Sequence, residues 1–94
     1  MALLSDDEIE QRLAGVEGWQ LGDEHTIVRE WKLADFAAAI TFVDSVAALA
    51  EAADHHPDIL LHGWNKVRLT LSTHSQGGLT DADFQLARQI DGLG

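Results

Sequence analysis

The single proline of the chain, Pro57, stands at the point that most restricts the fold. Before it, apolar residues recur at helical spacing from position 36 to 53, and Asp35 is a suitable N-cap. Proline lacks an N–H donor and drives the residue before it toward extended backbone, so the helix must end at His55 and His56. The sequence therefore predicts a helix from Asp35 to about Asp54, followed by extended chain.

Alternating and capping patterns predict the other elements. Residues 19–21 and 27–33 alternate around a turn at 22–25, and residues 59–62 and 67–71 form a second apolar and alternating pair. Ser5-Asp6-Asp7-Glu8 and Thr80-Asp81-Ala82-Asp83 both have the form of a capping box, which predicts short helices ending near Gly15 and Gly92. The resulting order αββαββα predicts an α+β fold, with a four-stranded antiparallel sheet and three helices packed on one face.

Composition limits the classes of function. The 94 residues predict one domain over residues 1–94, and the absence of cysteine excludes disulfides, thiolate nucleophiles and cysteine zinc sites. A formal charge of −10 opposes direct nucleic-acid binding. No apolar stretch is expected to reach the ~18 to 20 residues of a membrane helix, and the N-terminus lacks the pattern of a secretory signal. We therefore expect a cytoplasmic protein without membrane contact.

The predicted helix at 35–54 is apolar around an unusually wide part of its surface. Its apolar positions cover roughly half the circumference, whereas a one-sided surface helix shows a stripe of ~100°. This width predicts a homodimer or homotetramer, and the same helix could serve a different protein partner.

The imidazoles of His55, His56 and His74 and the carboxylates of Glu51 and Asp54 all lie between positions 51 and 74, which makes this segment the candidate for chemistry. Glu51 precedes His55 by four residues, so we expect the two side chains on one helix face. The helix dipole and the carboxylates of Glu51 and Asp54 favour a protonated imidazole, which suits a general acid. The alternative is a histidine that only caps the helix, a contribution of ~0.3 to 1 kcal/mol.

Three further residues have both a structural and a functional interpretation. Trp64 is either a core residue or a platform for a flat heterocycle, and His74 is either a solvated loop residue or a member of the site. Asp83 is most simply the third helical residue of a capping box and is kept as a weak site candidate. A dedicated metal site is not expected, because adjacent histidines diverge and no HExxH pattern is present.

These residues carry a resemblance to a known family. The spacing of Glu51, His55-His56-Pro57, Trp64, His74 and Asp83 resembles the signature of the pterin-4a-carbinolamine dehydratase family, as do the stretches 65–74 and 78–80 and the pairs Gly18-Trp19 and Asp35-Phe36. The resemblance implies a four-stranded antiparallel sheet with three helices. It also implies dehydration of 4a-hydroxytetrahydrobiopterin, a small pterin, to quinonoid dihydrobiopterin and water without a cofactor.

Roles follow from the resemblance as expectations. His55 and His74 would lie near the leaving hydroxyl, at least one as general acid, and His56 would orient the substrate or assist a base. The other candidates would bind the pterin or tune the imidazoles: Glu51, Asp54, Trp64, Ser72, Thr73 and Asp83. Some relatives of this family act as dimerisation or assembly cofactors, so a non-catalytic role of the same fold is the alternative.

Overall fold

The order of helices and strands is the one that the sequence predicts. The computed structural model describes residues 2–93. Its elements are α1 (Asp6–Leu13), β1 (Gln20–Leu21), β2 (Ile27–Lys32), α2 (Phe36–Ala53), β3 (Asp58–His62), β4 (Lys66–Leu71), a short 3₁₀ turn η1 (His74–Gln76) and α3 (Asp81–Asp91).

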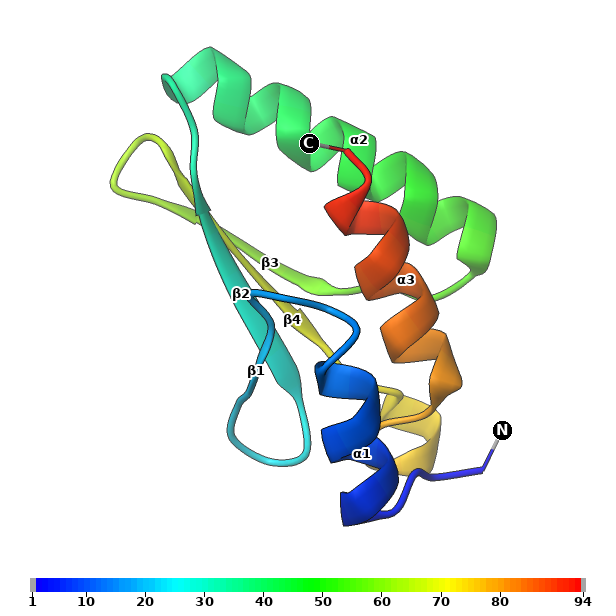
Figure 1. Cartoon of the computed structure of the whole chain (residues 1–94). Coiled ribbons are helices and arrows are strands. Elements are labelled where there is room, and N and C mark those ends of the chain that lie inside the picture. Colours follow the sequence, from blue (N-terminus) through cyan, green and yellow to red (C-terminus); the bar gives the residue numbers. More distant parts are fainter. Residues whose placement is uncertain (1, 94) are drawn as a thin grey trace.

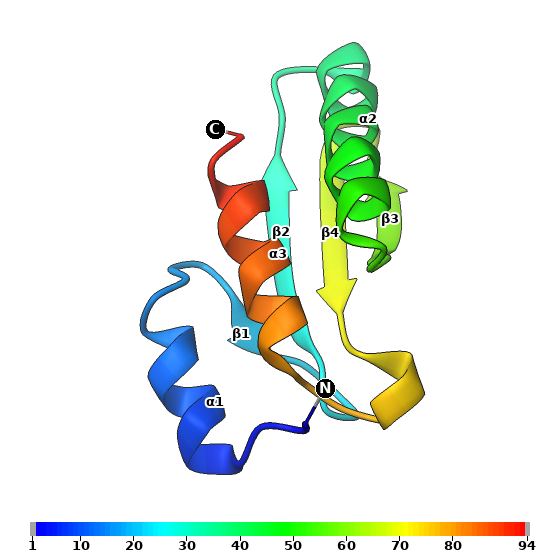
Figure 2. The same cartoon turned by 90° about the vertical axis from the view of Figure 1, so that its right-hand side faces the viewer.

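The strands form one antiparallel sheet in the order β1-β2-β4-β3, and all three helices lie on the same side of it (Figure 1). Figure 2 shows the molecule from the side of the helices, with α2 in front of β4 and β3 and with α3 beside α2. The predicted α+β fold is therefore confirmed. The other face of the sheet is not covered by any element of residues 2–93.

Alternation along the strands decides which side chains meet the helices. Val67, Leu69 and Leu71 of β4 have no exposed surface, whereas Lys66, Arg68 and Thr70 between them point to the uncovered face. The buried side chains pack against the apolar face of α3, which contributes Phe84, Leu86, Ala87 and Ile90. This alternation is the signature of a sheet with one face in the core and one in solvent.

The ends of α2 follow the predicted signals. Asp35 caps the helix by accepting a hydrogen bond from the main-chain N–H of Ala38 at 2.7 Å. At the other end Asp54 adopts a left-handed conformation with φ of 50°, and the chain then leaves the helix through Pro57 into β3. His55 and His56 therefore stand outside the helix, at the corner between α2 and the sheet.

The apolar surface of α2 is only partly used by the fold. Ala39, Val46 and Ala50 are buried against the sheet, but Phe36 is 53% and Ile40 42% exposed. By length and composition α2 is apolar enough to cross a membrane, with a mean hydropathy of 1.6 over 18 residues. The expectation that no apolar stretch reaches such a length was therefore wrong, because the many alanines of α2 count as apolar. The helix nevertheless carries Asp44 and Glu51 and lies on the sheet.

Candidate active site

The most unusual polar contact joins the corner after α2 to the first turn of α3. His55 Nε2 lies 2.5 Å from Asp83 Oδ1, and the Asp83 side chain is completely buried while that of His55 is 14% exposed. Because an ionised carboxylate can only accept hydrogen bonds, this contact places a proton on Nε2 of the ring. The second ring nitrogen, Nδ1, is then the one left for exchange of a proton with a ligand.

Asp83 is held by two further donors. Its Oδ2 accepts hydrogen bonds from the main-chain N–H of Thr80 and from the hydroxyl of Thr73, both at 2.9 Å. The Thr73 and Thr80 hydroxyl oxygens are 2.8 Å apart, so the Thr80 hydroxyl can donate to Thr73 while Thr73 donates to Asp83. The carboxylate therefore completes the capping box of α3, whose N-cap is Thr80, and also anchors the His55 ring.

The second histidine has a separate carboxylate partner. His56 Nε2 is in close contact with Glu51 Oε2, and these side chains are 58% and 75% exposed. The spacing of Glu51 and His55 predicted that those two would lie on one helix face, but α2 ends at Ala53 and His55 contacts Asp83 instead. The left-handed Asp54 turns the chain, so that His55 points into the protein and His56 points back along the helix toward Glu51.

A hollow of about 200 Å³ opens beside His55. The corner after α2 forms one wall and the segment that follows β4 forms the other. Its lining residues are Ala53, Asp54, His55, Thr73, Ser75, Gln76 and Ala82. Of the predicted site residues, the structure thus brings Asp54, His55 and Thr73 together, with Asp83 directly behind them. Ser75 and Gln76 were missed, because in sequence they read only as a polar loop.

His74 lies in the same segment but does not line the hollow. It is exposed and begins η1, whereas the sequence suggested a position at the end of a strand. Its neighbours Thr73 and Ser75 both line the hollow, so the His74 main chain passes beside it.

Part of the main chain that follows β4 is already hydrogen-bonded within its own loop. The N–H of Thr73 donates to Gly78 O at 2.8 Å, and its carbonyl accepts from Gln76 and Gly77 at 3.0 Å each. Of the three residues whose main chain was expected to meet the ligand, Thr73 is therefore used by its own loop. The His74 carbonyl likewise accepts from Gly77 N–H at 3.2 Å, so Ser72 and the N–H of His74 are the remaining candidates.

Trp64 lies at the far end of the sheet from His55. It is in the turn between β3 and β4, whereas the hollow is at the other ends of these strands. Its side chain is 61% exposed and its φ is 61°. The structure therefore places Trp64 neither in the core nor beside His55 of the same chain.

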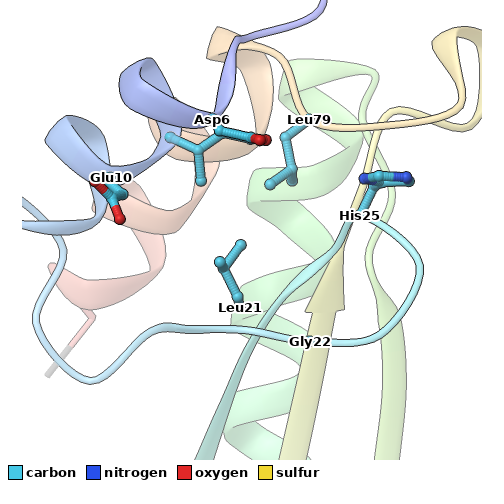
Figure 3. A pocket seen from close by; sticks show the side chains of 7 residues that line it. Asp6, Glu10, Leu21, Gly22, His25 and Leu79 are labelled. Atoms are coloured by element: carbon cyan, nitrogen blue, oxygen red, sulfur yellow. The ribbon is translucent and has the colours of Figure 1, made fainter.

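A larger hollow of about 490 Å³ lies between α1 and the turn after β1 (Figure 3). Figure 3 shows Leu21 and Leu79 facing each other across it, with Asp6 and Glu10 on the α1 side and His25 opposite. Among residues 2–93, none of the polar side chains that line it is joined to a buried carboxylate as His55 is, so we assign the candidate site to the smaller hollow beside His55. Among residues 2–93, no three histidine, aspartate or glutamate side chains are grouped as a metal ion requires.

Fold and site together define a small α+β protein in which a buried carboxylate holds a histidine beside a hollow. Comparison with known proteins gives the family. Residues 2–93 match the family described as pterin 4 alpha carbinolamine dehydratase. The chain belongs to this family, and its class of enzyme is the hydro-lyases, which remove water from a substrate.

Individual relatives are similar over nearly their whole length. A protein of Chloroflexus aggregans and one of Roseiflexus castenholzii, both provisionally named pterin-4-alpha-carbinolamine dehydratase, are 54% and 56% identical over 91 residues. These alignments cover 97% and 96% of this chain and 96% and 95% of the relatives.

Two solved structures are also similar. The transcriptional coactivator/pterin dehydratase from Brucella melitensis superposes with a TM-score of 0.92 at 35% identity, covering 98% of both chains. A pterin dehydratase-like protein, described as a RuBisCO assembly factor in the alpha-carboxysome, has a TM-score of 0.68 at 26% identity. That alignment covers 82% of this chain and 89% of the other.

Proposed function

We propose that the protein dehydrates 4a-hydroxytetrahydrobiopterin to quinonoid dihydrobiopterin and water, with His55 as a proton-transfer residue. The observation that carries this proposal is the contact between His55 and the buried Asp83, next to a hollow that a ligand can enter. Membership of the dehydratase family supports the reaction class.

The reaction needs two proton movements. The bond between C4a and the hydroxyl oxygen breaks, the hydroxyl leaves as water after it gains a proton, and N5 loses its proton as the N5–C4a double bond forms. Groups that are correctly placed for such transfers accelerate a reaction by ~10² to 10⁴-fold each. With Nε2 held by Asp83, His55 gives or takes its proton through Nδ1, so ring orientation is fixed before the substrate arrives.

The neighbouring residues divide the remaining tasks. His74, which stands in sequence between two residues that line the hollow, is the second proton-transfer residue near the leaving hydroxyl. His56, backed by Glu51, orients the pterin or assists the base, and Asp54 lines the hollow where a pterin N–H can donate to it. Asp83 is a positioning residue that acts through His55, because it is fully buried and its oxygens already accept hydrogen bonds.

Substitution of single histidines tests the proposal. The variants His55→Ala and His74→Ala are compared with His62→Ala, a matched control whose ring lies on the other face of the sheet. Loss of the carbinolamine is followed by absorbance with purified protein, and circular dichroism checks the fold. We expect losses of ~10² to 10⁴-fold for His55 and His74 and almost none for His62. Turnover by folded His55→Ala and His74→Ala equal to that of the control would refute the mechanism.

The exposed apolar side of α2 supports self-association as part of the proposal. A helix that leaves Phe36 and Ile40 exposed in a soluble assembly would normally be covered by another chain, and a homodimer or homotetramer would do so. We place this assembly in the cytoplasm. Sedimentation equilibrium of the wild type and of Ile40→Glu distinguishes a monomer from a homodimer or homotetramer. A monomeric wild type would contradict this interface.

A second candidate function is non-catalytic assembly of another protein. The similarity to a RuBisCO assembly factor and the exposed side of α2 favour it. In this case a partner protein would bind at residues 35–54 and pterin turnover would be absent. The carbinolamine assay separates the two functions, because turnover that depends on His55 supports only the enzyme.

A further inference from the structure

The uncovered face of the sheet carries two lysines and a histidine in one row. The strand register places Lys32 of β2 opposite Lys66 of β4, and Lys66 opposite His62 of β3. Residues directly opposite on neighbouring antiparallel strands point to the same side, so all three project from the face that has no helices. With strands ~4.8 Å apart, the row extends over about 10 Å.

This arrangement is costly for an acidic chain. The protein has only six lysines and arginines against 16 aspartates and glutamates, yet two lysines face each other directly. Like charges at opposite positions destabilise a sheet. Among residues 2–93, neither lysine forms an ion pair, whereas Arg12, Arg29 and Arg68 each pair with a carboxylate. Substitution of either lysine by a neutral residue would remove this repulsion.

Neither lysine of the row is paired with a nearby acidic group. Glu30 is one step along the sheet, and its Oε2 lies 3.2 Å from His62 Nε2 and 3.7 Å from Arg68 Nε. Glu30 thus contacts the histidine of the row and an arginine beside it, and neither lysine. Asp58 faces the same side but is four residues from His62 along β3, about 13 Å away at ~3.3 Å per residue. The Lys66 side chain reaches back over the turn, where its Nζ would lie 3.2 Å from a Cβ added to Gly63.

We propose that this row, formed by Lys32, Lys66 and His62, binds a small anion with two or more oxyanion groups. Phosphate and carboxylate groups share the required chemistry, because both accept hydrogen bonds from ammonium and imidazole N–H donors. A ligand with two such groups can bind both lysines at once, and its attraction to each ammonium group opposes the repulsion between them. The site is on the opposite face of the sheet from the helices, and at the opposite end of β3 and β4 from His55. It does not depend on the proposed dehydratase activity.

Thermal unfolding with two probe anions tests this site. Tripolyphosphate and citrate are titrated separately against the whole protein at about 0.01 M ionic strength, where surface charges are weakly screened. A ligand that binds only the folded state raises the melting temperature with concentration. We expect such a rise, and we expect it to shrink strongly at about 0.15 M salt. A larger effect of tripolyphosphate assigns the site to phosphates, and a larger effect of citrate assigns it to carboxylates.

The double variant Lys32→Gln/Lys66→Gln should bind either anion at least tenfold more weakly and, without anion, should be no less stable than the wild type. The matched control is Arg88→Gln, which removes an exposed arginine on α3 that forms no ion pair among the described residues. It should bind the anion as the wild type does. The proposal is overturned if the wild type shows no anion-dependent shift, or if the double variant shifts as much as the control.

Discussion

Replacement of Asp83 by asparagine tests the central contact of the site. The oxygen Oδ2 accepts from Thr80 N–H and from the Thr73 hydroxyl, so the asparagine must keep its carbonyl oxygen there. Its amide NH₂ then faces His55 in place of Oδ1, which lies 2.5 Å from Nε2 in the wild type. Since NH₂ is a donor, Nε2 must give up its proton, and the proton of a neutral ring moves to Nδ1. Nδ1, the nitrogen proposed to exchange a proton with the substrate, then carries a proton in the neutral ring and cannot accept one.

The size of the effect follows from these contacts. Loss of correctly placed proton transfer should lower kcat by ~10² to 10⁴-fold. KM should change little, because Asp83 is fully buried and does not line the hollow. Weakening a buried, charged hydrogen-bond acceptor should reduce the free energy of unfolding by ~1 to 3 kcal/mol. A domain of this size has ~5 to 15 kcal/mol, so the variant should fold. Alanine is less suitable, because it would leave three donors without an acceptor.

The assay combines steady-state loss of the carbinolamine with urea unfolding of the same preparations. Asp81→Asn is the matched control: it makes the same change two residues earlier in α3, where the side chain is 58% exposed and pairs with Arg12. Loss of that exposed ion pair should cost at most ~1 kcal/mol and leave kcat unchanged. If folded Asp83→Asn keeps a kcat within about twofold of Asp81→Asn, the proposed positioning of His55 is wrong.

Two further predictions concern residues outside this contact. Trp64→Ala should leave kcat and KM unchanged if each chain acts alone, because Trp64 lies at the other end of β3 and β4; a raised KM would indicate that another copy brings Trp64 to the hollow. Hydrogen bonds from the main chain and side chain of Ser5 lower the pKa of Glu8 below 4.5. The stability from Glu8 is thus fully present above pH 4.5 and is lost as the pH falls through the lowered pKa. The stability difference between wild type and Glu8→Gln, measured by urea unfolding, should shrink over that range, and a constant difference would contradict this linkage.

Local signals predicted most of the fold because its elements are specified locally. Asp35 and Pro57 bracket α2, and each capping box begins a helix at the predicted residue. The alternation in β4 predicted which of its side chains are buried. The width of the apolar surface on α2 was also visible, although the sequence did not show that Ala39, Val46 and Ala50 would face the sheet while Phe36 and Ile40 would not.

The site was less predictable because its main contact is between residues far apart in sequence. Helical spacing placed Glu51 and His55 on one helix face, but a left-handed residue at position 54 redirects the chain, and the contact of His55 is with Asp83, 28 residues further on. The motif identified Asp83 without showing that it would be buried behind the ring. Gln76 and Ser75 carry no pattern of their own, and only the folding of the loop against α2 shows that they line the hollow.

The double use of Asp83 joins the assembly of the site to the winding of a helix. The same carboxylate completes the capping box of α3 through Oδ2 and contacts the His55 ring through Oδ1, so displacement of α3 would also release the ring. A chain whose C-terminal segment has come loose loses the orientation of its histidine even if the sheet persists. Under the proposed mechanism, enzymatic turnover would therefore report on the integrity of α3.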